Sequence, residues 1–339
     1  MSKIQAKTTE YEKHLQSSID NENHEHINIE SAIDIKIQDI LTVGRFGSIK
    51  VKKSPSSNIT LNRMKDRRAQ MMVPKPRKSI NDIKLEFKRE LDTTCRYPYG
   101  CCVTKKGEFL FTNYECKNGK LIAINAEAEV EYTVLLKETY RAYDVASLND
   151  FTVAVSTGYS SKQLGISIVD LTKRKVIKII DLNNYPYGIT YDGKSLICCV
   201  GDKDLHVISC TDYSFTTIPN TFLPRYSYVS RHADKIFLTN PDKHIVTCCL
   251  YSGAQVWEFK DESVLNNPRG ITIDNKGNVF VVGMNSCNVV VLSPDGKDGK
   301  QILSKEDGLD KPTSIYFDKE RKQLLVTNQK QFVYIYNVS

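Results

Sequence analysis

Residues 268–282 read PRGITIDNKGNVFVV, two short apolar strands joined by a tight turn. The phrase that starts this stretch recurs, intact or as an echo, as Pro98-Tyr99-Gly100, Ala142-Tyr143-Asp144, Pro186-Tyr187-Gly188, Pro224-Arg225-Tyr226, Pro268-Arg269-Gly270 and Pro312-Thr313-Ser314. The first positions of successive phrases are 44, 44, 38, 44 and 44 residues apart. A β-rich repeat with a period in the forties is typical of a propeller, in which each repeat forms one blade.

Each repeat is predicted to contain four antiparallel strands, the composition of one blade. The sixth repeat stops after its third strand, and an incomplete blade would leave an unpaired edge. Residues 84–92 begin with alternating apolar and polar side chains, so we expect them to close the ring as the outer strand of the last blade. We therefore predict an all-β fold, a six-bladed β-propeller over residues 84–339.

The first 83 residues differ from the repeats in composition. Residues 1–26 are polar, with a few apolar positions at helical spacing, which predicts a helical segment resembling a coiled-coil remnant and a candidate for oligomerisation. Residues 27–53 alternate apolar and polar side chains and predict a short β-rich segment. Residues 54–83, rich in Ser, Pro, Lys and Arg, predict a basic flexible linker, with binding to an acidic surface or a nuclear address as the alternatives.

Charge and cysteine content narrow the classes of function. The chain of 339 residues has a net charge of +7, but residues 84–339 hold 32 Lys+Arg against 30 Asp+Glu. A nearly neutral propeller makes DNA an unexpected partner and RNA a second choice after protein. The ten cysteines form no Cys-x-x-Cys pair, so we expect no metal site and no cofactor. Because the chain has no signal-like or membrane-length apolar run, we expect a reduced, cytoplasmic protein without a membrane partner.

The repeats resemble NHL repeats, whose blades begin with Pro-x-Gly-Ile/Val and continue through an Asp-x-x-Gly-Asn hairpin. Residues 268–293 match this pattern closely, 98–113 and 186–200 match well, and 312–328 match in part. WD40 repeats are the alternative, but the chain contains no Trp-Asp dipeptide and Trp257 is its one tryptophan. The resemblance implies an NHL-type propeller.

Together with the segment that ends in FGSIKV (46–51), the repeats resemble the NHL class of tripartite-motif (TRIM) proteins, of the kind expanded in molluscs. Full-length members carry a RING domain and B-boxes, and the zinc ligands of both are absent here because the first cysteine is Cys95. The resemblance implies that the chain corresponds to the C-terminal part of such a protein. It implies substrate recognition in a TRIM-like ubiquitin-ligase system, without the ligase activity itself.

The middle residues of the phrases are the predicted binding site, because they encircle one mouth of the central channel. They are Tyr99, Tyr143, Tyr187, Arg225, Arg269 and Thr313, with Arg96, Arg141 and Lys311 within three residues of them. Tyr and Arg are enriched in protein interface hot spots, which favours a protein partner. Aromatic residues interleaved with arginines also suit single-stranded RNA. The remaining alternative is that these side chains only cover the rim.

Catalysis is not expected from this sequence. The propeller contains His206, His232 and His244, which the strand pattern places in different blades, so they do not converge on one metal. The sequence has no Gly-x-Ser-x-Gly motif and no phosphate-cradling glycine loop. We therefore predict a non-catalytic recognition module.

Overall fold

The computed structural model describes residues 27–32, 48–53, 80–115, 119–136, 140–160 and 164–339. The chain divides into two compact units, residues 1–75 and 76–339. In the first unit, β1 (Ile27–Ala32) and β2 (Ser48–Lys53) form an antiparallel pair. The predicted helix over 1–26 and most of the predicted linker over 54–83 lie outside the described residues.

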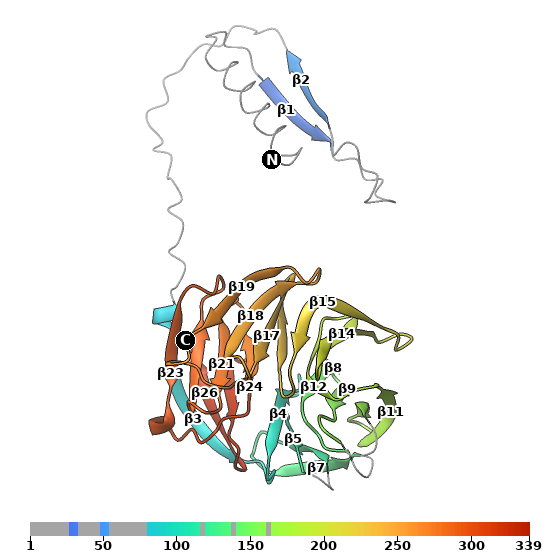
Figure 1. Cartoon of the computed structure of the whole chain (residues 1–339), viewed down its shortest axis with the longest axis vertical. Helices are drawn as coiled ribbons and strands as arrows, with labels where there is room; N and C mark the ends of the chain where they lie inside the picture. Colours follow the sequence, from blue (N-terminus) through green and yellow to red (C-terminus); the bar gives the residue numbers. More distant parts are fainter. Residues whose placement is uncertain (1–26, 33–47, 54–79, 116–118, 137–139, 161–163) are drawn as a thin grey trace. The chain divides into compact units, whose positions relative to one another are not determined.

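The second unit is a six-bladed β-propeller, which confirms the predicted fold class (Figure 1). Five blades consist of four consecutive antiparallel strands each. Blade 1 contains β4 (Pro98–Val103), β5 (Phe109–Asn113), β6 (Lys120–Ile124) and β7 (Val130–Leu135); blade 2 contains β8 (Val145–Asn149), β9 (Thr152–Ser156), β10 (Gly165–Asp170) and β11 (Lys175–Asp181); blade 3 contains β12 (Pro186–Tyr191), β13 (Ser195–Val200), β14 (Lys203–Ser209) and β15 (Phe215–Leu223). Blade 4 contains β16 (Val229–His232), β17 (Lys235–Asn240), β18 (Ile245–Leu250) and β19 (Gln255–Lys260), and blade 5 contains β20 (Pro268–Ile273), β21 (Val279–Gly283), β22 (Asn288–Leu292) and β23 (Gly299–Leu303).

The sixth blade joins the two ends of the propeller unit. It contains β24 (Ser314–Asp318), β25 (Gln323–Thr327), β26 (Phe332–Val338) and β3 (Leu85–Asp92), and β3 lies beside β26 in Figure 1. The two strands pair antiparallel from Phe332 opposite Asp92 to Val338 opposite Leu85. Because the first and last strands of the ring share one sheet, the blade that closes the ring has no missing strand.

The second strand of each blade is buried on both faces because neighbouring blades pack against each other. All five residues of β21 and all five of β25 are buried. Packing between blades also explains the adjacent cysteine pairs, all six residues of which are buried: Cys101-Cys102 on the first strand β4, Cys198-Cys199 on the second strand β13 and Cys248-Cys249 on the third strand β18. Small apolar side chains on alternate faces of one strand fill the space between neighbouring sheets.

The structure corrects the register of the fourth phrase. The residue that occupies the place of Gly188 in the next blade is Tyr228, because an ideal Cβ on Gly188 would meet the Cα of Tyr228 at 2.4 Å. The backbone N–H of Tyr228 donates to the Thr239 hydroxyl at 2.9 Å, the same bond that Gly100 makes to Thr112. Ser227, not Arg225, therefore stands at the middle position. The sequence pattern missed this because the preceding connection has a different length.

Two short 3-10 helices complete the second unit, η1 (Ile80–Asp82) and η2 (Lys305–Asp307). Ile80 is buried and packs in the apolar cluster of blades 5 and 6. No helix within the described ranges is long and apolar enough to cross a membrane.

Candidate functional site

The inner strands converge at the phrase end of the channel, and glycines make that convergence possible. Gly100, Gly188 and Gly270 each lie against a non-glycine residue of the next blade: Asp144, Tyr228 and Ser314 respectively. An ideal Cβ on Gly270 would stand 2.6 Å from the Cα of Ser314, closer than side chains are found. Glycine and non-glycine therefore alternate around the ring at this level. The third residue of the phrase is glycine in alternate blades because the backbones approach too closely there for a side chain on both.

Hydroxyls at the ends of second strands hold these inner positions. The Thr112 Oγ1 accepts from the N–H of Gly100 at 2.8 Å and donates to the carbonyl of Tyr143 in the next blade at 2.9 Å. The hydroxyl of Ser156 accepts from Asp144 and that of Thr327 accepts from Ser314 in the same way. Each such side chain satisfies the hydrogen bonds of buried backbone groups near the channel. These bonds hold the backbone of the phrase in place next to the second strand.

Six tyrosines gather at this end of the channel, and we name them the tyrosine cluster: Tyr99, Tyr114, Tyr143, Tyr187, Tyr226 and Tyr228. Tyr143 is central, with ring centroids of the other five at 5.0 to 6.2 Å. Its hydroxyl donates to the carbonyl of Tyr226 at 3.0 Å, and the hydroxyl of Tyr228 donates to the carbonyl of Tyr99. Burial raises the pKa of Tyr143 and of Tyr228 well above the usual value, so both stay neutral hydrogen-bond donors.

Four arginines stand over tyrosine rings around this cluster. Their guanidinium carbons lie 4.8 to 5.5 Å from ring centroids, in the pairs Arg96–Tyr97, Arg141–Tyr114, Arg141–Tyr159, Arg225–Tyr185 and Arg269–Tyr226. These distances are those of cation–π contacts. We name the accessible part of this set the rim surface: Arg96, Tyr97, Tyr99, Arg141, Tyr159, Tyr185, Arg225, Tyr226 and Arg269.

Several of the positive charges on this face are paired with carboxylates. Arg96 lies 3.7 Å from Glu115, and Arg225 lies 3.5 Å from Asp202. Lys330 pairs with Asp310 at 3.0 Å on the neighbouring loops. The rim surface is therefore aromatic, and two of its four arginines have a carboxylate partner.

The structure separates the predicted site residues by exposure. Arg96, Arg225 and Lys311 are exposed, and Tyr99, Arg141 and Arg269 are half-buried. Tyr143 and Tyr187 have no exposed surface, and Thr313 is 1% exposed, with its hydroxyl donating to the carbonyl of Pro98. Tyr143, Tyr187 and Thr313 build the rim from inside and offer a ligand no surface in this conformation. The sequence showed which residues begin the blades but not the direction of their side chains.

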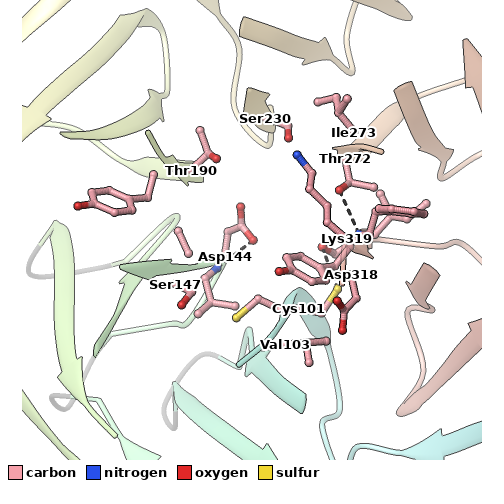
Figure 2. A pocket seen from close by; sticks show the side chains of 18 of the residues that line it. Cys101, Val103, Asp144, Ser147, Thr190, Ser230, Thr272, Ile273, Asp318 and Lys319 are labelled. Carbon is pink, nitrogen blue, oxygen red and sulfur yellow. Dashed lines mark hydrogen bonds between the residues drawn. The ribbon is translucent and has the colours of Figure 1, made fainter. Parts of the chain in front are cut away.

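The opposite end of the channel opens into a cavity of about 430 Å³. All six inner strands line it, and Ser314 is among the lining residues. The hydroxyls of Ser147, Thr190, Ser230 and Thr272 are also lining groups (Figure 2). Tyr228 of the tyrosine cluster also lines it. The volume falls within the range of small-molecule sites in proteins.

Two buried aspartates line this cavity, Asp144 and Asp318, and Asp144 was not among the predicted site residues. It is 7% exposed; one carboxylate oxygen accepts from the N–H of Val145 and the other from the N–H of Ile189, both at 2.9 Å. Burial raises its pKa to about 7, against the lowering effect of these two hydrogen bonds. The signal in the sequence was an aspartate where the other phrases carry glycine, tyrosine or serine.

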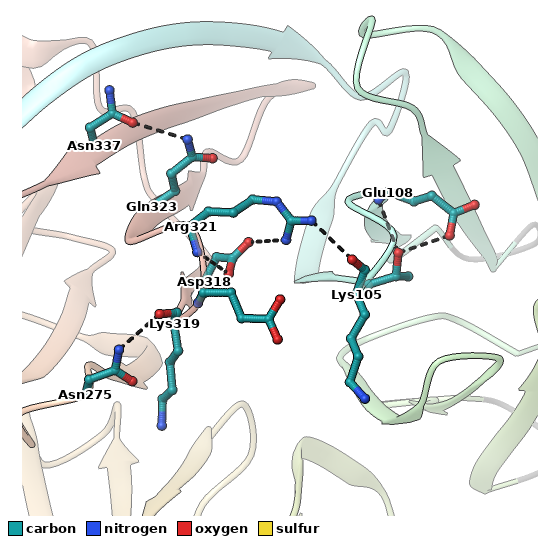
Figure 3. A network of polar contacts seen from close by, with 10 residues as sticks. Lys105, Glu108, Asn275, Asp318, Lys319, Arg321, Gln323 and Asn337 are labelled. Atoms are coloured by element: carbon teal, nitrogen blue, oxygen red, sulfur yellow. Dashed lines mark hydrogen bonds and ion pairs between the residues drawn. The ribbon is translucent and has the colours of Figure 1, made fainter.

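Charged residues surround the mouth of the cavity. Arg321 bridges two blades, since its guanidinium lies 2.9 Å from Asp318 and donates to the carbonyl of Lys105 (Figure 3). Arg231 donates to the carbonyl of Asp192, and Lys105 pairs with Asp150. Lys319 points into the cavity in Figure 2, and no carboxylate of the described residues lies within ion-pairing distance of it. Partial burial of the ammonium, together with Arg231, lowers its pKa.

Within the described part of the chain, no group of three or more His, Cys, Asp or Glu side chains is arranged to hold a metal ion. His206 stacks on Phe215 in blade 3, while His244 accepts a hydrogen bond from the backbone of Asn267. His232 and His244 lie in the same blade, blade 4, and not in different blades as the strand pattern predicts, because β16 ends at His232 and His244 precedes β18. His206 and His244 take part in local packing and turn structure.

Solved structures similar to this one in fold are only distantly related to it in sequence, and one of them is a β-propeller domain. A protein of unknown function from Bacteroides thetaiotaomicron has a TM-score of 0.58 and 12% identity over 72% of this chain and 70% of that one. Virginiamycin B lyase from Staphylococcus aureus has a TM-score of 0.55 and 17% identity over 76% of this chain and 99% of its own. The Cps50 (Swd1) β-propeller domain of Myceliophteria thermophila has a TM-score of 0.55 and 8% identity over 75% and 100%.

No family model matches the sequence, and no curated protein matches it. At these identities the structural likenesses establish the fold and nothing finer. The class of protein defined by fold and site is therefore a six-bladed β-propeller with an aromatic rim at one end of its channel and a polar cavity at the other.

Proposed function

We propose that this propeller is a non-catalytic recognition module that binds a protein partner through the rim surface. The observation that carries the proposal is the set of arginines lying over tyrosine rings. A guanidinium held on a ring is pre-organised, so it loses less side-chain entropy when a partner covers it. Tyr and Arg are also the residues that most often dominate binding energy at protein interfaces.

The contacts of the rim surface favour protein over RNA. RNA affinity depends on free cations that neutralise phosphates, whereas Arg96 and Arg225 already pair with carboxylates. Stacking platforms need an open ring face, and Tyr143 and Tyr187 are fully buried. Single-stranded RNA binding is therefore the alternative that the experiment has to exclude.

The resemblance of the repeats to TRIM-NHL propellers supports a more specific form of the proposal. In this form the rim surface recognises substrates for a ubiquitin ligase whose RING domain is supplied by another chain or segment. We expect a RING-containing ligase to co-purify with the wild-type propeller. We also expect the partner that binds the rim surface to be ubiquitinated. A rim-bound partner whose ubiquitination does not change when the propeller is removed would contradict this form.

The test compares a rim variant with a matched variant at the opposite end of the channel. The rim variant is Tyr159→Ala with Arg225→Ala, both exposed and therefore expected to fold. The control is Tyr251→Ala with Lys105→Ala, which removes the same kinds of side chain from the hairpin loops. The expected partners are proteins that the wild type and the control capture from an extract of the source cells and that the rim variant does not capture.

Binding of a purified partner should weaken at least about 10-fold in the rim variant, because each hot-spot truncation costs about 2 kcal/mol or more. A rim variant that retains the wild-type set of partners and affinities would refute the proposal. In parallel, labelled random single-stranded RNA is titrated at about 50 and about 200 mM salt. If the wild type binds RNA, the rim variant does not, and the affinity falls steeply between these two salt concentrations, then the ligand of the rim surface is RNA and not a protein.

A further inference from the structure

The cavity at the end of the channel opposite the rim surface is lined by a carboxyl group and an ammonium group that form no ion pair with any described residue. Asp144 accepts only backbone hydrogen bonds, from Val145 and Ile189, and no Lys, Arg or His is among the groups that affect its titration. Lys319 lies at the mouth without an ion-pair partner among the described residues. A buried carboxylate without a counter-charge is costly, so Asp144 favours a ligand cation, whereas the ammonium of Lys319 is exposed and free to pair with a ligand anion.

The two groups lie on different blades of the same cavity. Asp144 immediately precedes β8 of blade 2, and Lys319 immediately follows β24 of blade 6. Figure 2 shows the carboxylate and the ammonium both directed into the open space between the inner strands. Arg231 on β16 and Arg321 next to β25 add positive charge at the mouth but are engaged with Asp192 and Asp318.

We infer that the cavity binds a small zwitterion, with a cationic amine on Asp144 and a carboxylate or phosphate near Lys319. The lining hydroxyls of Ser147, Thr190 and Ser230 supply further hydrogen-bond partners of either polarity. A volume of about 430 Å³ suits a molecule of metabolite size rather than a polymer. The site is independent of the proposed function, because the rim surface lies at the other end of the channel.

The neighbours of Asp144 leave it available to such a ligand. The ionisable side chains around it are Cys101, Cys102, Cys198, Cys199 and Tyr228, and burial raises the pKa of every one of them, so they are neutral. A ligand amine would therefore be the first cation within hydrogen-bonding reach of this carboxylate among the described residues. The competing explanation is purely structural, in which Asp144 only connects the backbones of blades 2 and 3.

The experiment measures binding of a panel of small molecules to the full chain by titration calorimetry and thermal shift. The zwitterions are β-alanine, 4-aminobutanoate and phosphoethanolamine. The controls are ethanolamine as a cation, propionate as an anion and glycerol as a neutral polyol. At about 10 mM even a millimolar site is largely filled. At least one zwitterion is expected to bind and raise the melting temperature, while ethanolamine and propionate bind at least about 10-fold more weakly.

Variants assign the two ends of the ligand. Asp144→Asn and Lys319→Met should each weaken binding of the zwitterion at least about 10-fold, whereas Arg96→Ala at the rim should not change it. Lys319 is exposed along its side chain, so its variant is expected to fold even if Asp144→Asn does not. Absence of binding by every zwitterion, unchanged affinity in Lys319→Met, or ethanolamine binding as tightly as the zwitterion would each overturn the inference.

Discussion

Substitution of Asp144 by Asn should change how the stability of the propeller depends on pH. The pKa of this carboxyl is raised from 3.8 to about 7 by burial, so the folded chain keeps a proton that the unfolded chain has lost between these values. Where the folded state binds more protons, the free energy of unfolding falls as pH rises. The wild type is therefore expected to lose stability steadily from about pH 4 to about pH 7.

The size of the effect follows from the shift. One pKa unit corresponds to 1.36 kcal/mol, so two pH units within this window amount to about 2.7 kcal/mol. For a domain of this size that is a fall in melting temperature of roughly 5 to 11 °C between pH 5 and pH 7, which Asp144→Asn should not show. The side chain is 7% exposed, so solvent screening reduces the effect little.

The assay follows the single tryptophan, Trp257, whose indole N–H donates to the carbonyl of Pro294 in the next blade and therefore reports on blade packing. Melting temperatures of wild type and Asp144→Asn are recorded at pH 5, 6, 7 and 8, and their difference is plotted against pH. Groups elsewhere contribute equally to both proteins and cancel in this difference. A difference that stays constant within about 1 °C across the range would refute the buried, cation-free environment assigned to Asp144.

Three further substitutions or deletions test the architecture itself. Gly270→Ala should lower stability by about 1–3 kcal/mol, because the new Cβ meets the backbone of Ser314; an unchanged melting temperature would show that the blades move apart freely. Thr112→Val should cost about 1–3 kcal/mol in urea unfolding, since it leaves buried backbone groups unpaired, while the exposed Thr133→Val should not. Deletion of residues 84–92 should lower the melting temperature by at least about 10 °C, because β26 loses one of its two neighbouring strands; an unaltered transition in calorimetry would show that the ring does not need this strand.

The sequence predicted the number of blades because the close approach of inner strands forces a recurring signature at each blade start. Where that signature was weak, the predicted start of the blade was wrong by two residues. In the fourth blade the glycine position is occupied by Tyr228, whereas the sequence pattern places Tyr226 there. The burial of Tyr143 and Tyr187 could not be predicted, because it depends on rings from four blades meeting in one cluster. The same limit applies to the cavity, which exists only once residues far apart in sequence surround one axis.

The alternation of glycine and larger residues at the phrase end has a consequence for the symmetry of the ring. Six similar repeats behave as three pairs, each made of a blade with glycine at this position and a blade with a side chain there. Duplicating or removing a single repeat would place two glycines or two side chains next to each other, leaving a gap or a clash next to the axis. Propellers built from this sequence should therefore tolerate changes of blade number in steps of two.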